Sequence, residues 1–476
     1  MKCFCEYDIA VLGGGSGGLV VASAAAQLGA GVLLVEKNKL GGDCLFHGCV
    51  PSKTFIESSR VVWQMKNADL FGIKKQNVEF DYTDIISRVQ EVIKDIAKHD
   101  TPERFESLGC EVVFGSPKFV SDHKIEVGGK IFPVKKVVIA VGGRPAIAPI
   151  PGLEEVGFLT NLNFFENTKF PENLIVFGAG PIGIELAQAM NRLGSKVDVL
   201  DKADSILTKE DEEVRNYMEG LLAKEGLNFH LGVDIKEVQR TAKGKKVIFR
   251  KEGKVLTLEG DEIFVGLGRA PNVEDMELER AGIKYSRKGI IVDGYQKTSA
   301  PNIYACGDCT EGLQFTHAAS YQAGIIIQNV LFPFKAKANY DAFPWVTYTE
   351  PEVARIGLTE EDAKSKFGNI KVYHFNVGDN DRFKAMGSKG GFIKVVTDIK
   401  GYILGAHIVS AHAGEFLPQL VIAMKKKMKF AELANFVVSY PTAVEVIKQA
   451  ALIARKEALK PWVKKVIKKV AGLKGN

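Results

Sequence analysis

The sequence lacks a large excess of charge of either sign. Its 63 basic and 57 acidic residues leave a formal net charge of +6 over 476 residues. This mild excess differs from the clustered basic surface that marks nucleic-acid binding proteins. We therefore expect no nucleic-acid partner.

It also lacks the uninterrupted run of about 18 apolar residues that a bilayer-spanning helix needs. The apolar stretch at residues 9–26 contains five glycines and follows Glu6 and Asp8, so it predicts a strand, a loop and a helix rather than a signal peptide. With 46% hydrophobic and 25% charged residues, the chain has the composition of a soluble globular protein of about three domains.

Cysteine is sparse, and none follows Cys309. A small secreted scaffold would instead have a dense set of paired cysteines, so the sequence indicates a reducing, cytoplasmic location. The seven cysteines are Cys3, Cys5, Cys44, Cys49, Cys110, Cys306 and Cys309.

Two segments, residues 8–36 and 174–201, repeat one pattern: an apolar strand, a glycine turn, a helix, a second strand and an acid. The helices are expected to end near Leu28 and Leu193, and in both copies the acid follows the first glycine by 23 positions. Such glycines let the backbone turn tightly and approach a pyrophosphate at a helix N-terminus, while the acid accepts hydrogen bonds from ribose hydroxyls. Two dinucleotide sites in one chain indicate a relay of electrons.

The remaining pattern predicts an α/β fold with two Rossmann-like domains and a C-terminal α+β domain. A polar helix is expected at about 84–108, and similar strand-turn segments lie at 137–145 and 263–272. Strands at 391–396 and 403–409 belong to the last domain. The predicted division is residues 1–150, 151–270, 271–342 and 343–476, the first and third forming one domain.

Cys44 and Cys49, with four residues between them, lie in a glycine-flanked segment just after the first nucleotide unit. Pro51 suits the first turn of a helix, so Cys49 would lie near a positive helix N-terminus with Lys53 nearby, and both favour the thiolate. The segment predicts a redox-active pair; the alternative is two small buried core cysteines.

These features together resemble the pyridine nucleotide-disulfide oxidoreductases, the flavoprotein family of dihydrolipoamide dehydrogenase, glutathione reductase and mercuric reductase. The resemblance covers essentially the whole chain. It implies an FAD domain in two pieces, an inserted NAD(P) domain, a C-terminal dimerisation domain and a homodimer. The motifs that carry it are the two glycine turns, the Cys44–Cys49 segment, residues 303–308 and residues 349–354.

The resemblance also implies roles for individual residues. Cys49 would be the charge-transfer thiol that faces the flavin, Cys44 the interchange thiol that meets the substrate, and Lys53 would pair with Glu185 near the flavin. The residues expected to bind FAD are Gly13, Gly15, Ser16, Gly18, Glu36, Lys37, Gly42, Asp43, Lys53, Gly142, Arg269, Asp308 and His317. Those expected to bind NAD(P)H are Gly178, Gly180, Pro181, Ile182, Gly183, Glu185, Asp201 and Gly268.

Tyr440 stands where relatives acting on dihydrolipoamide or glutathione use a histidine, five residues before Glu445. With Cys44, Cys49 and Lys53 these two complete the candidate catalytic set, and no metal ligands are expected. A tyrosine of ordinary pKa near 10 is a poor base at neutral pH.

The acceptor is therefore left open between a metal ion, a disulfide and another small molecule. Mercuric reductases also have tyrosine at the position of Tyr440, but they usually end in a further cysteine pair, which this sequence does not contain. The alternatives are a membrane-surface NADH:quinone reductase acting directly from the flavin, and a flavin-bearing subunit of a larger complex.

Three smaller features complete the predictions. Asp201 would accept a ribose 2′-hydroxyl and repel a 2′-phosphate, which favours NADH over NADPH. Cys306 and Cys309 form a CxxC motif without a second one, so core cysteines are expected. Cys3 and Cys5 lie in a terminus where incidental placement is expected over a thiol relay.

The C-terminal tail predicts an amphipathic helix. One face would contain Trp462, Val463, Val466, Ile467, Val470 and Leu473, and the other Lys464, Lys465, Lys468 and Lys469. Such a helix can pack on its own domain or dimer mate with a solvated lysine face, or lie on an anionic membrane surface. A peripheral membrane contact is therefore one of two interpretations.

Overall fold

The computed structural model describes residues 6–242, 244–388, 390–459 and 461–473. They form two compact units. Unit 1 contains residues up to 63 together with 78–202 and 228–339, and unit 2 contains 64–77, 203–227 and the chain from 340 onward.

Unit 1 begins with a sheet whose parallel part has the strand order β3-β2-β1-β6-β18. The long strand β6 also pairs through its first half with an antiparallel hairpin, β5 and β4. The strands are β1 (Tyr7–Leu12), β2 (Val32–Glu36), β3 (Cys110–Phe114), β4 (Lys118–Ser121), β5 (Lys124–Val127), β6 (Lys130–Ile139) and β18 (Ile303–Ala305). Most of β1 and the last three residues of β6, 137–139, are buried on both faces, which explains their continuous apolar sequence.

The second half of unit 1 repeats this plan with a parallel sheet of order β10-β9-β8-β14 and a three-stranded antiparallel sheet of order β11-β12-β13. The strands are β8 (Asn173–Phe177), β9 (Lys196–Leu200), β10 (Asn228–His230), β11 (Asp234–Arg240), β12 (Lys245–Lys251), β13 (Lys254–Gly260) and β14 (Glu262–Val265). The duplication predicted from the two glycine turns is therefore confirmed.

The two strand-turn segments predicted at 137–145 and 263–272 end in short strands that pair with each other. β7 (Gly143–Pro145) and β15 (Arg269–Pro271) run antiparallel. β7 follows β6 of the first parallel sheet and β15 follows β14 of the second, so this pairing connects the two halves of unit 1.

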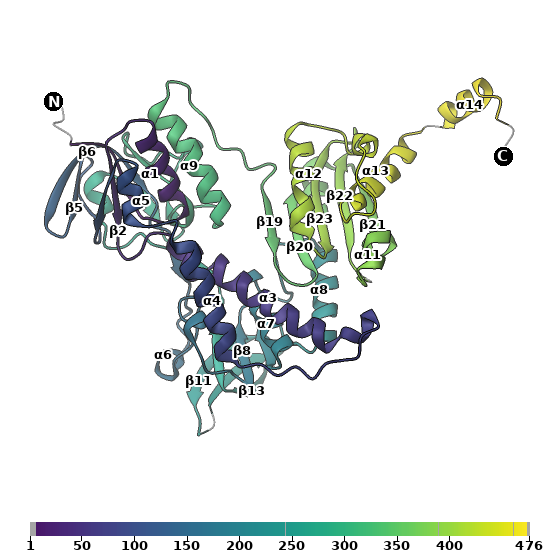
Figure 1. Ribbon diagram of the computed structural model, residues 1–476, viewed down its shortest axis with the longest axis horizontal. Helices are drawn as coiled ribbons and strands as arrows, with labels where there is room; N and C mark the ends of the chain where they lie inside the picture. Colours follow the sequence, from purple (N-terminus) through teal and green to yellow (C-terminus); the bar gives the residue numbers. More distant parts are fainter. Residues whose placement is uncertain (1–5, 243, 389, 460, 474–476) are drawn as a thin grey trace. The chain divides into compact units, whose positions relative to one another are not determined.

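The helices of the glycine turns lie as predicted. α1 (Ser16–Gln27) and α7 (Pro181–Leu193) start directly after the turns, and Figure 1 shows α9 (Thr316–Leu331) beside α1. The other helices and short strands of this region are α2 (Gly42–Phe46), α3 (Cys49–Lys66), α4 (Tyr82–Ala97), α5 (Pro102–Ser107), α6 (Leu153–Val156), β16 (Tyr285–Ser286) and β17 (Gly289–Ile290).

One secondary-structure prediction was wrong. The single helix expected at 84–108 is two helices, α4 and α5. Pro102 cannot donate to a preceding carbonyl, and the Thr101 side chain accepts a hydrogen bond from the backbone N–H of Arg104 as the N-cap of α5. The pair Thr101-Pro102 therefore marks the start of a new helix within the polar pattern.

Unit 2 contains an antiparallel sheet of order β19-β20-β23-β22-β21. Figure 1 shows α12 and α13 packed along it, and their apolar sides fill one core with the sheet. The strands are β19 (Pro344–Thr347), β20 (Glu352–Gly357), β21 (Ile370–Asn376), β22 (Phe392–Asp398) and β23 (Ile403–Ser410). The helices are α8 (Glu212–Glu225), α10 (Glu360–Phe367), α11 (Asp381–Ala385), α12 (Ala413–Lys425), α13 (Glu445–Ala458) and α14 (Pro461–Val470).

The predicted class, two Rossmann-like halves and a C-terminal α+β part, is confirmed. The domain limits at 150, 270 and 342 stay a prediction. Within the described ranges, the model contains no helix long and apolar enough to cross a membrane.

Candidate functional site

The two cysteines of the predicted redox pair lie at a helix start in unit 1. Cys44 is half-buried on the short helix α2, and Cys49 is the exposed first residue of the 18-residue helix α3. The two side chains are within hydrogen-bond reach of each other. The structure therefore brings together the pair that the sequence singles out.

The two thiols differ in acidity. The hydrogen bond from Cys44 is the largest cause that lowers the pKa of Cys49. Together with a bond to Thr316 and the charge of Lys53, it outweighs the partial desolvation of the sulfur and the charge of Glu185 and brings this pKa to about 6. The same contact raises the pKa of Cys44, and burial adds to the increase. At neutral pH Cys49 is thus a thiolate, and Cys44 carries the proton that the two share.

Thr316 is a site residue that the sequence prediction missed. Its Oγ1 lies 3.3 Å from Cys49 Sγ, and it is the first residue of α9. The positive N-terminal ends of α3 and α9 therefore meet at one sulfur atom, and each favours negative charge there. No pattern in the sequence connects two residues 267 positions apart, although the predicted FAD residue His317 is its neighbour.

An ion pair joins the two halves of unit 1 beside this sulfur. Lys53 Nζ on α3 donates to Glu185 Oε2 on α7 across 2.8 Å, and the Glu185 side chain is only 6% exposed. Glu185 follows the second glycine turn by two residues. The predicted pairing of Lys53 with Glu185 is confirmed.

A second cluster gathers three of the predicted FAD residues. Arg269 donates to Asp308 Oδ2 across 2.7 Å, and its guanidinium lies 3.0 Å from Asp43 Oδ2. Asn161, which the sequence prediction missed, donates to the other Asp43 oxygen and to the backbone of His47. This network holds the cysteine segment against the β7–β15 junction.

The two glycine turns have the same geometry. Gly13 and Gly178 both adopt φ +108°, and a side chain on either would collide with a backbone carbonyl 2.4 or 2.5 Å away. The acids make matching contacts: Glu36 accepts from the backbone N–H of Gly14 at 2.7 Å, and Asp201 from that of Ala179 at 2.6 Å.

The turns also leave the space that a cofactor requires. A Cβ on Gly180 would meet nothing within 4 Å, and one on Gly15 only the Gly42 backbone at 3.7 Å. Gly15 is the N-cap residue of α1 and Gly180 that of α7. The free backbone N–H groups at such a helix N-terminus bind phosphate. The residues present therefore fit a dinucleotide pyrophosphate at each turn.

The other predicted binding residues lie in the same segments of unit 1. Ser16 and Gly18 are in the first turn of α1, Pro181, Ile182 and Gly183 are in the first turn of α7, and Lys37 follows β2. Gly142 and Gly268, both with positive φ, immediately precede β7 and β15. His317 is the second residue of α9, with its ring against Phe315.

Tyr440 and Glu445 lie in unit 2. The Tyr440 side chain is 71% exposed, and its hydroxyl donates to Asp381 Oδ2 across 3.0 Å, a contact that raises its pKa. Glu445 begins α13 and accepts from the backbone N–H of Thr442. The hydrogen-bond partner that positions the Tyr440 hydroxyl is therefore Asp381, which the sequence prediction missed.

Two of the remaining cysteines lie in the core. Cys306 and Cys309 are buried in the two apolar cores of the first sheet, and burial raises the pKa of both, that of Cys309 to about 12. Their interpretation as core residues is confirmed. Cys3 and Cys5 lie outside the described residues.

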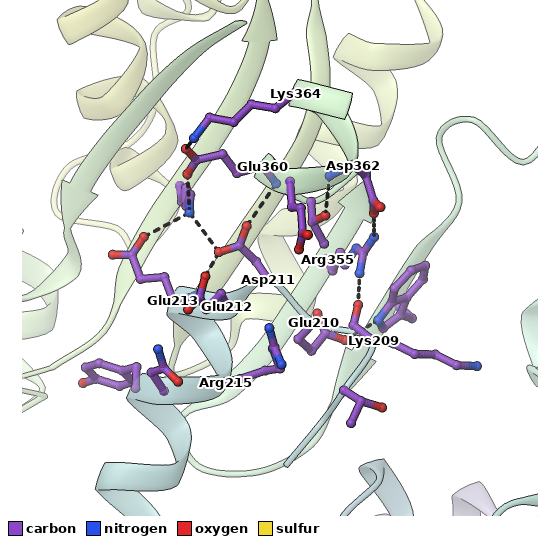
Figure 2. Close-up of a pocket in the computed structure, with 17 residues that line it drawn as sticks. Lys209, Glu210, Asp211, Glu212, Glu213, Arg215, Arg355, Glu360, Asp362 and Lys364 are labelled. Carbon is purple, nitrogen blue, oxygen red and sulfur yellow. Dashed lines mark hydrogen bonds and ion pairs between the residues drawn. The ribbon is translucent and has the colours of Figure 1, made fainter. Parts of the chain in front are cut away.

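Unit 2 contains a cavity of about 1180 Å³ with strongly charged walls. At its edge Lys394 Nζ lies 2.8 Å from Asp211, 3.2 Å from Glu213 and 2.8 Å from Glu360, and Figure 2 shows these carboxylates converging on one nitrogen. Lys394 and Asp211 are almost fully buried. None of the predicted site residues lines this cavity, and its ion pairs connect α8, α10 and β22 within the unit.

Comparison with known proteins agrees with this geometry. Residues 7–323 match the model of pyridine nucleotide-disulphide oxidoreductases, and residues 343–451 match the dimerisation domain of the same group, which indicates a homodimer. The chain is 31% identical to a mercuric reductase of Lysinibacillus sphaericus over 96% of this chain and 84% of that protein. It is 32% identical to a dihydrolipoyl dehydrogenase of Bacillus subtilis over 93% and 98%.

Its fold is also similar to that of a solved structure, the HOCl-induced flavoprotein disulfide reductase RclA from Escherichia coli. The TM-score is 0.84 with 25% sequence identity, over 93% of this chain and 99% of that one. The quinone reductase and the subunit of a larger complex find no support among these relatives. The chain belongs to the pyridine nucleotide-disulphide oxidoreductase family and is an enzyme that uses FAD and NAD(P)H.

Proposed function

We propose that this enzyme passes electrons from NADH through FAD to a Cys44–Cys49 disulfide, and that the resulting dithiol reduces a thiol-reactive acceptor. The observation that carries the proposal is the Cys49 sulfur at the N-terminus of α3, 3.3 Å from the first residue of α9. A thiolate is the reactive form of cysteine, and this arrangement stabilises it.

The cofactors, when bound, supply an electron pair as hydride from the nicotinamide and pass it on from the flavin. The residues of the chain hold and tune the thiols. Lys53 places a positive charge near Cys49, and its ion pair with Glu185 fixes that charge at the junction of the two halves of unit 1. Cys44 keeps its proton and is proposed as the thiol that meets the acceptor.

The cofactor residues named from the sequence are proposed to bind accordingly. The first turn with Glu36 would hold the adenosine half of FAD, and Arg269, Asp43 and Asp308 would lie against its ribityl and phosphate portion. The second turn would hold the nicotinamide dinucleotide. Asp201 accepts a hydrogen bond from the turn backbone and is proposed to accept one from the ribose 2′-hydroxyl and to repel a 2′-phosphate, so NADH is proposed over NADPH.

For the acceptor we favour a soft metal ion over a disulfide. Exchange with a disulfide substrate needs a group that accepts and returns a proton near neutral pH. The Tyr440 hydroxyl already donates to Asp381, and this bond raises its pKa, so it stays protonated. A soft metal ion displaces the proton of Cys44 to solvent as it binds both sulfurs as thiolates, so it needs no such group, and the named relatives include mercuric reductases.

We also propose where in the cell the enzyme acts. The few cysteines favour the cytoplasm, and the C-terminal helix α14 is proposed to make a peripheral membrane contact. The domain limits at 150, 270 and 342 are proposed as the borders of the FAD, NAD(P) and dimerisation parts.

The test is NADH oxidation by the purified protein with mercuric ion in excess thiol, beside lipoamide and a soluble quinone. We expect turnover with the metal to be abolished in Cys44→Ser and retained in Cys110→Ala, which alters a buried cysteine outside the pair. Turnover with quinone alone, unaffected by Cys44→Ser, would contradict the proposal.

A further inference from the structure

The C-terminal helix α14 exposes an apolar face that the described part of unit 2 does not cover. Trp462 is 62% exposed, Val466 50%, Ile467 46% and Val470 82%, and Leu473 just beyond the helix is 54% exposed. Large apolar side chains normally lie in a core. A row of them on one short helix indicates a surface that binds something.

The helix separates its residue types completely. At about 100° per residue, the apolar positions Trp462, Val463, Val466, Ile467 and Val470 fall within an arc of about 140°. The exposed side chains of Lys465, Lys468 and Lys469 fall outside this arc, at about 240° to 340°, with Lys469 at its border beside Trp462. This is the pattern of a helix that lies in an interface with its apolar face inserted and its lysines toward the polar layer.

The charge of the segment identifies the partner. After Glu457 the sequence contains six lysines and no aspartate or glutamate. A second copy of this chain has a net charge of +6 and offers no overall attraction to such a segment. The anionic headgroups of a membrane leaflet attract each lysine near the surface.

The family model of the dimerisation domain does not include this helix. The match to the dimerisation domain ends at residue 451, before α14 begins at Pro461. Trp462 is the first side chain of the apolar face, and tryptophan favours the headgroup level of a bilayer, where one end of the ring is apolar and the other is wet.

We propose that α14 docks the enzyme on membranes that contain anionic phospholipids, with Trp462, Val466, Ile467 and Val470 inserted and Lys465, Lys468 and Lys469 on the headgroups. In a homodimer, each protomer contributes one such helix, and the pair is proposed to engage the same membrane. Because binding of the second helix is then intramolecular, the pair holds more firmly than one helix alone. The contact would not span the bilayer.

The test is co-sedimentation of the full-length dimer with vesicles of phosphatidylcholine alone and of phosphatidylcholine mixed with phosphatidylglycerol. We expect binding only to the anionic vesicles and weaker binding as salt is added. The variant K465E/K468E/K469E should bind at least about tenfold more weakly. The matched control K254E/K371E/K400E makes the same charge change at exposed lysines elsewhere and should lose much less.

The apolar face is tested by the variant V466S/I467S/V470S. This variant should no longer bind the anionic vesicles, while its mass in solution, measured by light scattering, should still be that of a dimer. NADH oxidation with a soluble acceptor should be unchanged in all these variants, so loss of docking is distinguishable from loss of the redox function. The proposal is overturned if the wild type ignores anionic vesicles or if the tail variants bind like the wild type. It is also overturned if the serine variant falls apart into monomers, which would make this face a contact between copies.

Discussion

Lys53 Nζ donates to Glu185 Oε2 across 2.8 Å, and this ion pair joins the helix that begins with Cys49 to the helix of the second glycine turn. The same lysine lowers the pKa of Cys49 by its charge. One residue therefore connects the predicted nicotinamide half of unit 1 to the acidity of the redox thiol.

Replacing this lysine should weaken the thiolate. In Lys53→Met the pKa of Cys49, about 6 in the wild type, is expected to rise by about one unit because the nearby cation is gone. The pKa of Cys49 is measured from the pH dependence of the long-wavelength charge-transfer absorbance that a thiolate gives with oxidised flavin. The control is Lys66→Met, at the other end of α3, which should leave the pKa of Cys49 unchanged. An unchanged pKa in Lys53→Met would show that the charge of Lys53 does not stabilise the thiolate.

Thr316 should act on the same sulfur through its hydroxyl. Thr316→Val removes the hydrogen bond at 3.3 Å and is expected to raise the pKa of Cys49, whereas Thr316→Ser keeps a hydroxyl and should stay close to the wild type. The rate of alkylation of Cys49 by iodoacetamide against pH, with the modified residue located by mass spectrometry, gives this pKa. If valine and serine behave alike, the hydroxyl has no role in thiolate stability.

The buried lysine of unit 2 should be important for stability. Lys394→Met leaves Asp211, Glu213 and Glu360 without their shared cation, and breaking a buried ion pair in this way costs about 3 to 5 kcal/mol of unfolding free energy. Urea denaturation at fixed protein concentration measures the loss. Lys364→Met, which breaks an exposed pair with Glu360 on one helix, should cost only about 0.5 kcal/mol; equal losses would refute the distinction.

His407 should make unit 2 sensitive to acid. Its side chain is fully buried, its Nε2 donates to the Leu358 carbonyl at 3.1 Å, and burial lowers its pKa to about 4, with Asp211 opposing and Arg355 adding to the decrease. An unfolded chain titrates this histidine near 6.5 and so binds more protons than the folded chain between pH 6.5 and 4.

The neutral His407 therefore makes its full contribution to the free energy of unfolding above pH 6.5. As the pH falls from 6.5 to about 4, this free energy decreases by about 3 kcal/mol. His407→Gln keeps a donor for Leu358 and should flatten this part of the stability profile, measured by urea denaturation at several pH values. A variant profile as steep as that of the wild type would assign the acid sensitivity to other groups.

Much of the site was predictable because its chemistry is local in the sequence. The glycine turns are recognised from short runs of neighbouring residues, and Gly13 and Gly178 adopt the same φ. Cys49 and Lys53 lie in the first turns of one helix, so their proximity could be predicted from the sequence of that helix alone. The pairing of Lys53 with Glu185 came from resemblance to a family and not from spacing.

The contacts that were missed connect distant segments. Thr316 reaches Cys49, Asn161 reaches Asp43, and Asp381 reaches Tyr440 through the packing of separate elements. Hydrophobic periodicity says nothing about such polar contacts. The break between α4 and α5 was missed because the polar pattern continues through Pro102, where only the cap residue marks a new start.

The most direct test of the redox role of the cysteine pair is an anaerobic titration of the oxidised, FAD-loaded protein with NADH. The wild type is expected to accept one electron pair more than Cys44→Ser, because only the wild type contains a reducible disulfide beside the flavin. Equal uptake by the two proteins would contradict it and place the exit of electrons at the flavin itself.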